Sequence, residues 1–194
     1  MVRAVEQAIG QSTGAKAIDA VKLLKQDHRE VEDLFEQFEA AEQDEQGEIA
    51  ERVCQLLTVH ATIEEELLYP AAKEAFEAEE DDDLVNEAEV EHATAKDLIA
   101  KIEAMAPQDE LFKATVKVLS EYIKHHVKEE ETEMFPKLKE TDVDLKALGT
   151  QLYERKIELM EELGIEPAEE EETPAKGRKS SAAGKAKSSK RRKH

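Results

Sequence analysis

The strongest constraint in this sequence is a two-part pattern that occurs twice. Residues 27–34 (DHREVEDL) align with residues 91–98 (EHATAKDL), with an acid before each histidine and Asp-Leu at the same offset. Residues 60–64 (HATIE) align with residues 126–130 (HVKEE), and a proline follows ten residues after each of those histidines. The chain therefore contains two copies of one structural unit.

Apolar residues recur at three- and four-residue steps in each copy, which is the period of an amphipathic helix. We expect helices over about residues 15–41, 45–78, 79–105 and 107–136, with Pro70 kinking the second or ending its regular part. Only 4% of the residues are aromatic, and there are only seven Gly and five Pro, as is typical of a helical chain. The prediction is an all-α, up-down four-helix bundle.

The remaining segments extend this bundle domain, which we place at residues 15–140. Residues 1–14 form an N-terminal extension in which residues 2–9 could be a short helix. Residues 141–165 are expected to form an additional helix, opened by Thr141 and Asp144 as a capping box and stopped by Gly164. Residues 166–194 lose all periodicity and run from acidic to basic, so we predict a disordered tail.

The charge distribution limits the partners of the chain. The formal net charge is -20, and an acidic body is a poor match for nucleic acid. Only residues 174–194, with nine Lys or Arg and no acid, could contact it. No apolar run is long enough to span a membrane, and the N-terminus lacks the apolar run of a signal peptide. With Cys54 as the single cysteine, these features predict a cytoplasmic protein.

The doubled pattern also defines a candidate metal site. Residues four apart on a helix lie about 40° apart around its axis, so His60 and Glu64 point the same way. The same holds for His126 and Glu130, and the other two helices would add His28 and His92. Four imidazoles and two carboxylates suit a pair of ions such as iron or manganese. Each ion would be bound by two histidines and share both carboxylates as bridges, which leaves open positions for a small molecule.

Several neighbours of this set need a separate interpretation. His125 has Glu129 four residues later, but the repeat favours His126, so we expect His125 to be exposed. We predict that the acids beside the bridging residues form a solvated face; these are Glu65, Glu66, Glu129 and Glu131. Cys54 is expected to be an ordinary small residue.

Two further residues are candidates for contact with the site. Tyr122, one turn before His126, either borders the metal pocket as a hydrogen-bond donor or redox-active side chain, or is a core aromatic residue with a satisfied hydroxyl. Glu89, one turn before His92, could orient that histidine.

Residues 20–138, with this doubled His and His-x-x-x-Glu pattern, resemble the hemerythrin-like domain, also called the HHE cation-binding domain. The resemblance implies a non-haem di-iron centre with an oxygen-type bridge. It implies a protein that binds or senses dioxygen, nitric oxide or peroxide, with roles such as oxygen binding or stress response. The alternatives are a di-iron enzyme that disproportionates peroxide, as a catalase does, or catalyses another redox step, and a role in iron–sulfur repair or iron storage and delivery.

One position departs from the oxygen-carrying members of that family. Those proteins have a further histidine one turn after the third-helix histidine, where this chain has Lys96. The set of four histidines and two glutamates is closer to the symmetric sites of the iron–sulfur repair proteins. Those proteins carry a cysteine-bearing N-terminal domain, which has no counterpart in this sequence.

Overall fold

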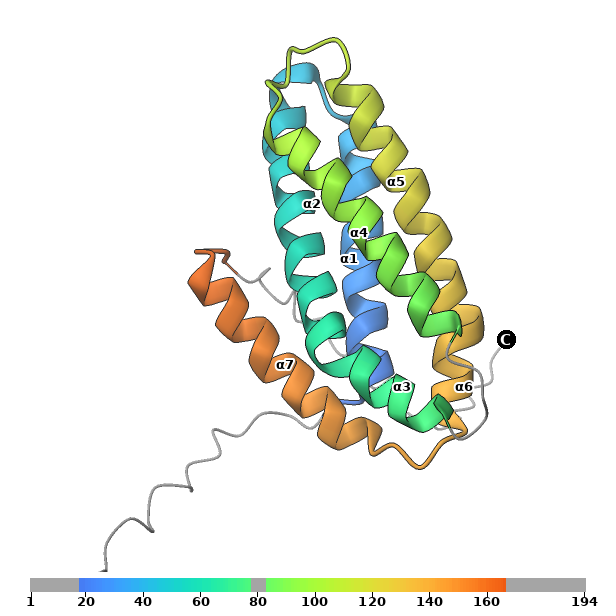
Figure 1. Cartoon of the computed structure of the whole chain (residues 1–194). Helices are drawn as coiled ribbons and strands as arrows, with labels where there is room; N and C mark the ends of the chain where they lie inside the picture. Colours follow the sequence, from blue (N-terminus) through green and yellow to red (C-terminus); the bar gives the residue numbers. More distant parts are fainter. Residues whose placement is uncertain (1–17, 78–82, 167–194) are drawn as a thin grey trace, which may run out of the picture.

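A computed structural model of the chain describes residues 18–77 and 83–166. The expected helix at residues 2–9 and the basic segment 174–194 lie outside these ranges. The described residues form an up-down bundle (Figure 1) whose four main helices are α1 (Ala20–Ala40), α2 (Gln43–Ile63), α4 (Asp83–Glu103) and α5 (Phe112–Glu129). The prediction of an all-α bundle with one extra helix is confirmed. No helix in the described ranges combines the length and the apolar character needed to cross a membrane.

The core of the bundle is built from the apolar stripes that the sequence shows. In α1, buried residues recur three or four positions apart, as in Leu24, His28, Val31, Phe35 and Phe38. Phe38 meets Phe112 of α5 with their ring centroids 6.2 Å apart, which closes one end of the bundle. His28 lies in the same buried stripe of α1, so the stripe carries a polar group into the core.

Two of the helices continue past a short π-helical turn. Helix α2 runs through η1 (Glu64–Leu68) into α3 (Tyr69–Glu77), and α5 runs through η2 (Glu130–Met134) into α6 (Phe135–Lys139). The Tyr69 amide donates to the Glu64 carbonyl, and the Phe135 amide donates to the Glu130 carbonyl. Pro70 and Pro136, one residue further on, have no amide hydrogen to donate. The regular α-helical part thus ends at Ile63, before Pro70, and the wider π turn leads on into α3.

Two predicted helix starts are displaced for local reasons. The fourth helix begins at Phe112 and not at Pro107, because the Asp109 carboxylate accepts from the Ala106 amide and holds this stretch in a turn. Helix α7 (Leu145–Glu162) is capped by Asp144, which accepts from the amides of Lys146 and Ala147. The expected capping box that starts at Thr141 is therefore wrong.

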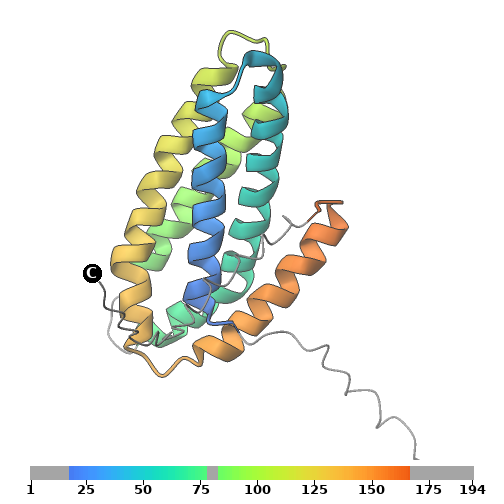
Figure 2. The ribbon, with the colours of Figure 1, turned by 180° about the vertical axis from the view of Figure 1, so that it is seen from behind.

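Helix α7 stops just before Gly164, as expected, and Gly164 has φ 67°, in the left-handed region that glycine tolerates. The helix packs outside the bundle against α1 and α2 (Figures 1 and 2). Arg155 of α7 donates to the Glu66 carboxylate of η1 over 2.7 Å and 3.2 Å. This contact places α7 next to the π turn that begins at Glu64.

Gly149 allows α7 to approach the start of α1 closely. A Cβ atom at this position would lie 2.1 Å from the Ile18 carbonyl oxygen and 2.6 Å from the Ala20 amide nitrogen. We therefore expect Gly149→Ala to lower the free energy of unfolding by about 1–3 kcal/mol, as overpacking against backbone does. Thermal unfolding of the metal-free chain measures this, with Thr150→Ala as the control on the same helix. Equal midpoints for both variants would show that α7 is not closely packed.

Candidate metal centre

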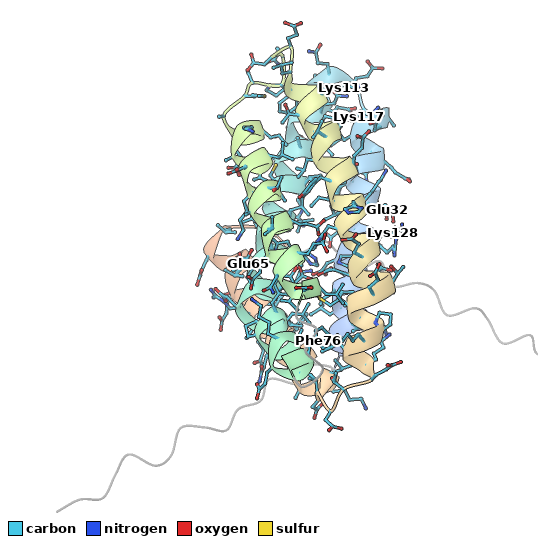
Figure 3. All side chains as sticks on the ribbon, turned by 45° about the vertical axis from the view of Figure 1, so that its right-hand side comes forward. Glu32, Glu65, Phe76, Lys113, Lys117 and Lys128 are labelled. Carbon is cyan, nitrogen blue, oxygen red and sulfur yellow. The ribbon has the colours of Figure 1, made fainter. Side chains whose placement is uncertain are left out.

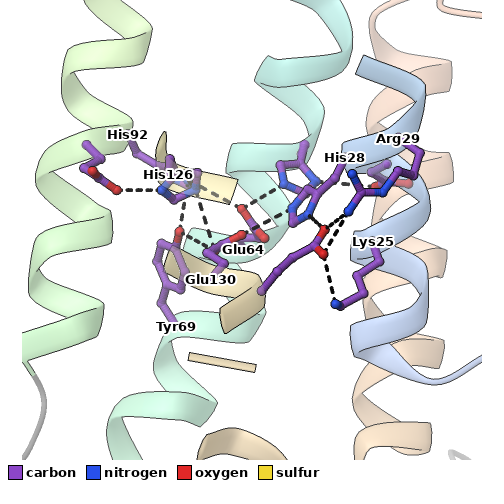
Figure 4. A network of polar contacts seen from close by, with 12 residues as sticks. Lys25, His28, Arg29, Glu64, Tyr69, His92, His126 and Glu130 are labelled. Atoms are coloured by element: carbon purple, nitrogen blue, oxygen red, sulfur yellow. Dashed lines mark hydrogen bonds and ion pairs between the residues drawn. The ribbon is translucent and has the colours of Figure 1, made fainter. Parts of the chain in front are cut away.

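The six residues singled out by the repeat come together inside the bundle. Figure 4 shows His28, Glu64, His92, His126 and Glu130 among them. His28 comes from α1, His60 from α2, His92 from α4 and His126 from α5; Glu64 and Glu130 are the first residues of η1 and η2. All six are buried, and the two glutamates are 0% and 1% exposed. His125 is 57% exposed, in agreement with the prediction that His126 is the inward residue.

The four histidines form two pairs. His28 and His60, the first pair, have ring centroids 4.9 Å apart. His92 and His126, the second pair, have centroids 4.8 Å apart, and their Nε2 atoms are 3.1 Å from each other. Each pair therefore directs two ring nitrogens at one point.

Each carboxylate reaches both histidine pairs. Glu64 Oε2 lies 3.2 Å from Nε2 of His60 and 3.4 Å from Nε2 of His92. Glu130 Oε2 lies 3.3 Å from Nε2 of His28, and its Oε1 lies 3.6 Å from Nε2 of His126. This is the arrangement that two bridging carboxylates need, with one ion position beside each pair.

Several buried polar atoms in this region have no hydrogen-bond partner. Among the described residues, the buried side-chain atoms without a hydrogen-bond partner all belong to this region: Asp27 Oδ2, His28 Nε2, both ring nitrogens of His60, both carboxylate oxygens of Glu64, and Glu130 Oε2. Unpaired buried polar atoms are costly. The set His28, His60, Glu64 and Glu130, and the set Glu64, His92 and His126, each bring their ligand atoms within 4.8 Å of one another, so both could hold a metal ion.

The outward ring nitrogens face a second group of acids, which we call the outer carboxylates: Asp27, Glu65, Glu91 and Glu131. His28 Nδ1 lies 3.0 Å from Glu131, His92 Nδ1 3.1 Å from Glu65 and His126 Nδ1 2.8 Å from Glu91, whereas His60 Nδ1 lies 3.5 Å from Asp27. An ionised carboxylate only accepts, so each hydrogen-bonded Nδ1 donates. The Nε2 atoms are then directed inward toward Glu64 and Glu130, as metal ligation requires.

This arrangement corrects three predictions. Glu65 and Glu131 are not part of a solvated face, because each supports a histidine across the bundle; Glu65 lies at the edge next to α4 (Figure 3). Glu89 does not orient His92, because it pairs with Lys73 at 2.6 Å on the surface. The repeat contained a signal for the correct set, since Glu65 and Glu131 occupy matching positions one residue after the bridging glutamates.

Cations in turn hold the outer carboxylates. Lys25 and Arg29 bind Glu131, and both oxygens of Glu65 accept from Lys96 at 2.6 Å. Lys96, the residue that departs from the oxygen-carrying hemerythrins, thus contacts Glu65, which in turn faces His92. Asp27 accepts from Lys156 of α7 at 2.7 Å.

The electrostatics of this cluster favour opposite charges on its two kinds of group. Burial alone lowers the pKa of His126, but the charge of Glu130 and the hydrogen bond to Glu91 outweigh it and raise the pKa to about 9. Burial likewise raises the pKa of Glu130, but the charges of His126 and His28 lower it to about 2. The carboxylate is therefore ionised and available as a ligand at neutral pH. Cys54 is buried, and burial raises the pKa of its thiol to about 12, in line with an inert small residue.

The π turns bring two aromatic residues to the centre that the sequence interpretation did not assign. The Tyr69 hydroxyl donates to Glu130 Oε1 at 3.2 Å and lies 3.0 Å from Nε2 of His92. Phe135, its counterpart in the repeat, stacks on His28 with an interplanar angle of 9°. Tyr122, the sequence candidate, is half-buried, and Ile123 lines the site in its place. The reason is that the inward stripe of α5 runs through Leu119, Ile123 and His126.

A small apolar cavity adjoins all four histidines. It measures about 20 Å³ and has a largely aliphatic wall built from Val31, Leu57, Ala61, Ala95, Ile99, Ile123 and Val127. Glu64 and Glu130 do not line it. A space of this size holds about one water-sized molecule.

The fold and the site define a helical bundle of the metal-binding class, in which buried histidines and carboxylates could hold metal ions. The chain matches the Hemerythrin HHE cation binding domain over residues 19–138, and it belongs to this family. Helix α7 lies beyond the matched residues.

Two known proteins resemble the chain over most of its length. A "DNA nickase" from Nostoc sp. (strain PCC 7120) is 27% identical over 133 residues, which are 68% of this chain; the match spans 37% of that protein. The crystal structure of a Hemerythrin HHE cation binding domain-containing protein from Mycobacterium kansasii matches with a TM-score of 0.64 and 23% identity. That match covers 75% of this chain and 89% of the other, and it supports the fold.

Proposed function

We propose that this protein holds two iron ions and binds a small molecule, such as dioxygen, nitric oxide or peroxide, at their open positions. His28 and His60 would hold one ion, His92 and His126 the other, and Glu64 and Glu130 would bridge them. The observation that carries the proposal is that each buried carboxylate reaches both histidine pairs, at 3.2–3.4 Å for Glu64 and 3.3–3.6 Å for Glu130. Bound iron supplies open coordination positions and a change of oxidation state.

The cavity supports a small, uncharged or weakly polar ligand. It is lined by all four histidines and bordered by Asp27 and Lys96, whereas Glu64 and Glu130 do not line it. The rest of the wall is aliphatic, and a volume of about 20 Å³ admits only a molecule of few atoms. Larger organic substrates do not fit this space, so selection by size follows from the packing.

A second candidate is a redox enzyme in which one peroxide is reduced to water and another is oxidised to dioxygen. Tyr69 favours it, because a hydroxyl that contacts Glu130 and His92 can donate a proton at the centre. Burial, together with the charges of Glu130 and Glu64, raises the pKa of Tyr69 well above its ordinary value. The phenol therefore keeps its proton at neutral pH.

The metal site is tested with a matched pair of adjacent histidines. His126→Ala removes an inward ligand, whereas His125→Ala removes the exposed neighbour. After anaerobic iron reconstitution, we expect two irons per chain in the wild type and in His125→Ala, and one or fewer in His126→Ala. Iron analysis and optical spectra measure this, and equal iron content in the two variants would refute the assignment.

Filling the cavity separates ligand binding from metal binding. Ala95→Val adds two carbons to the wall, so we expect azide, used as a probe, to bind the iron-loaded protein on the order of tenfold more weakly. Iron content should stay unchanged. Ala88→Val, at a buried position of the same helix away from the cavity, is the control for overpacking. An unchanged azide titration in Ala95→Val would place the ligand elsewhere.

The enzyme candidate is tested at the two tyrosines. If peroxide disproportionation is the function, Tyr69→Phe should slow oxygen evolution by roughly a hundredfold, the loss expected for a proton donor. Tyr122→Phe should leave the rate near that of the wild type. If the iron-loaded wild type evolves no oxygen from peroxide, the enzyme candidate is wrong. If only Tyr122→Phe slows oxygen evolution, Tyr122 and not Tyr69 is the proton donor.

A further inference from the structure

The two histidine pairs have equivalent outer carboxylates, Asp27 and Glu131 for the first and Glu91 and Glu65 for the second, but different cations hold them. Asp27 and Glu91 are repeat counterparts, each one residue before a histidine of the set and each facing a histidine of a neighbouring helix. Asp27 binds the Lys156 ammonium at 2.7 Å. Glu91 lies 3.7 Å from His125, whose side chain is 57% exposed. The lysine that binds Asp27 comes from α7, which lies outside the two repeated segments.

Lys156 differs from the other cations around the centre in its burial. Its side chain is 15% exposed, compared with 38% for Lys25, 46% for Lys96 and 57% for Arg29. Exposed ion pairs contribute little, whereas breaking a buried pair leaves an uncompensated charge. Asp27 is itself 8% exposed in its side chain. Loss of Lys156 would therefore leave the nearly buried Asp27 carboxylate, which faces His60, without its ammonium partner.

The position of Lys156 is fixed by its neighbours on α7. Arg155 holds the Glu66 carboxylate in η1, two residues after Glu64, and Gly149 lets the helix lie against the backbone of residues 18–20. Helix α7 thus contacts α1 and α2, which carry the first histidine pair, and η1, which carries Glu64.

From these contacts we propose that α7 positions one of the two metal sites, acting through Lys156, which holds the Asp27 carboxylate against His60. The proposal rests on the metal centre proposed above. Lys156 is a positioning residue, since it touches neither the ligand atoms nor the cavity. The site of the second pair has no such support from α7 and is expected to respond differently.

The test uses the full-length chain and Co²⁺ as the probe, titrated without oxygen. We expect Lys156→Met to weaken the binding of one of two Co²⁺ ions by roughly tenfold, because Asp27, the outer partner of His60, is then no longer held in place. The other ion should bind as before. Lys156→Arg, which keeps the charge, should restore most of the affinity, and Lys146→Met, which removes an exposed lysine from the same helix, should have no effect.

Two further measurements identify the path of the effect. In an Asp27→Asn background, Lys156→Met should cause no additional loss, because the two residues act as one unit. The exchangeable Nδ1 hydrogen of one Co²⁺-bound histidine should also exchange faster with solvent in Lys156→Met and Asp27→Asn alike. A merely structural role for Lys156 would not select one of the four histidines.

The outcomes separate this inference from the function on which it rests. If the wild type binds fewer than two Co²⁺ ions, the metal centre is wrong and this inference fails with it. If the wild type binds two ions and Lys156→Met behaves like Lys146→Met, only this inference fails. Equal weakening of both ions, or additive losses with Asp27→Asn, would also overturn it.

Discussion

Two carboxylates buried among four imidazoles are the constraint on which the rest of this structure depends. Glu64 and Glu130 are almost completely excluded from solvent, and such groups are tolerated only when partners of opposite charge or metal ions meet them. Their partners come from all four main helices. The bundle must therefore hold these helices in one register, and the apolar stripes on either side of the site maintain it.

Support for the cluster continues outward in steps. The inner atoms face one another, the outward ring nitrogens face the outer carboxylates, and cations from the surface and from α7 hold those carboxylates in turn. Each step becomes more exposed, so each contributes less individually. Together they orient the imidazoles, which is what a metal site needs from the protein around it.

The internal repeat makes the two halves of the centre similar, and a few residues make them unequal. Tyr69 places a hydroxyl beside His92, whereas Phe135 places a ring against His28. Lys156 supports Asp27, and His125 is the counterpart beside Glu91. Of two metal ions held here, the one at His92 would therefore have a hydroxyl beside its histidine. The one at His28 and His60 would have a lysine behind Asp27.

The sequence by itself determined the helical class, the helix order and the six residues of the inner cluster. The spacing of residues along one helix fixes which side chains share a face, and His-x-x-x-Glu occurs in both halves of the chain. Only the tertiary structure decided which residues surround that cluster. Glu65 and Glu131 would point about 100° away from the bridging glutamates on a straight helix, yet a neighbouring helix meets each of them. Tyr69 reaches the centre because a π turn precedes it, and Lys156 because α7 folds back over α1. Such contacts depend on turns and docking between distant segments, which periodicity does not encode.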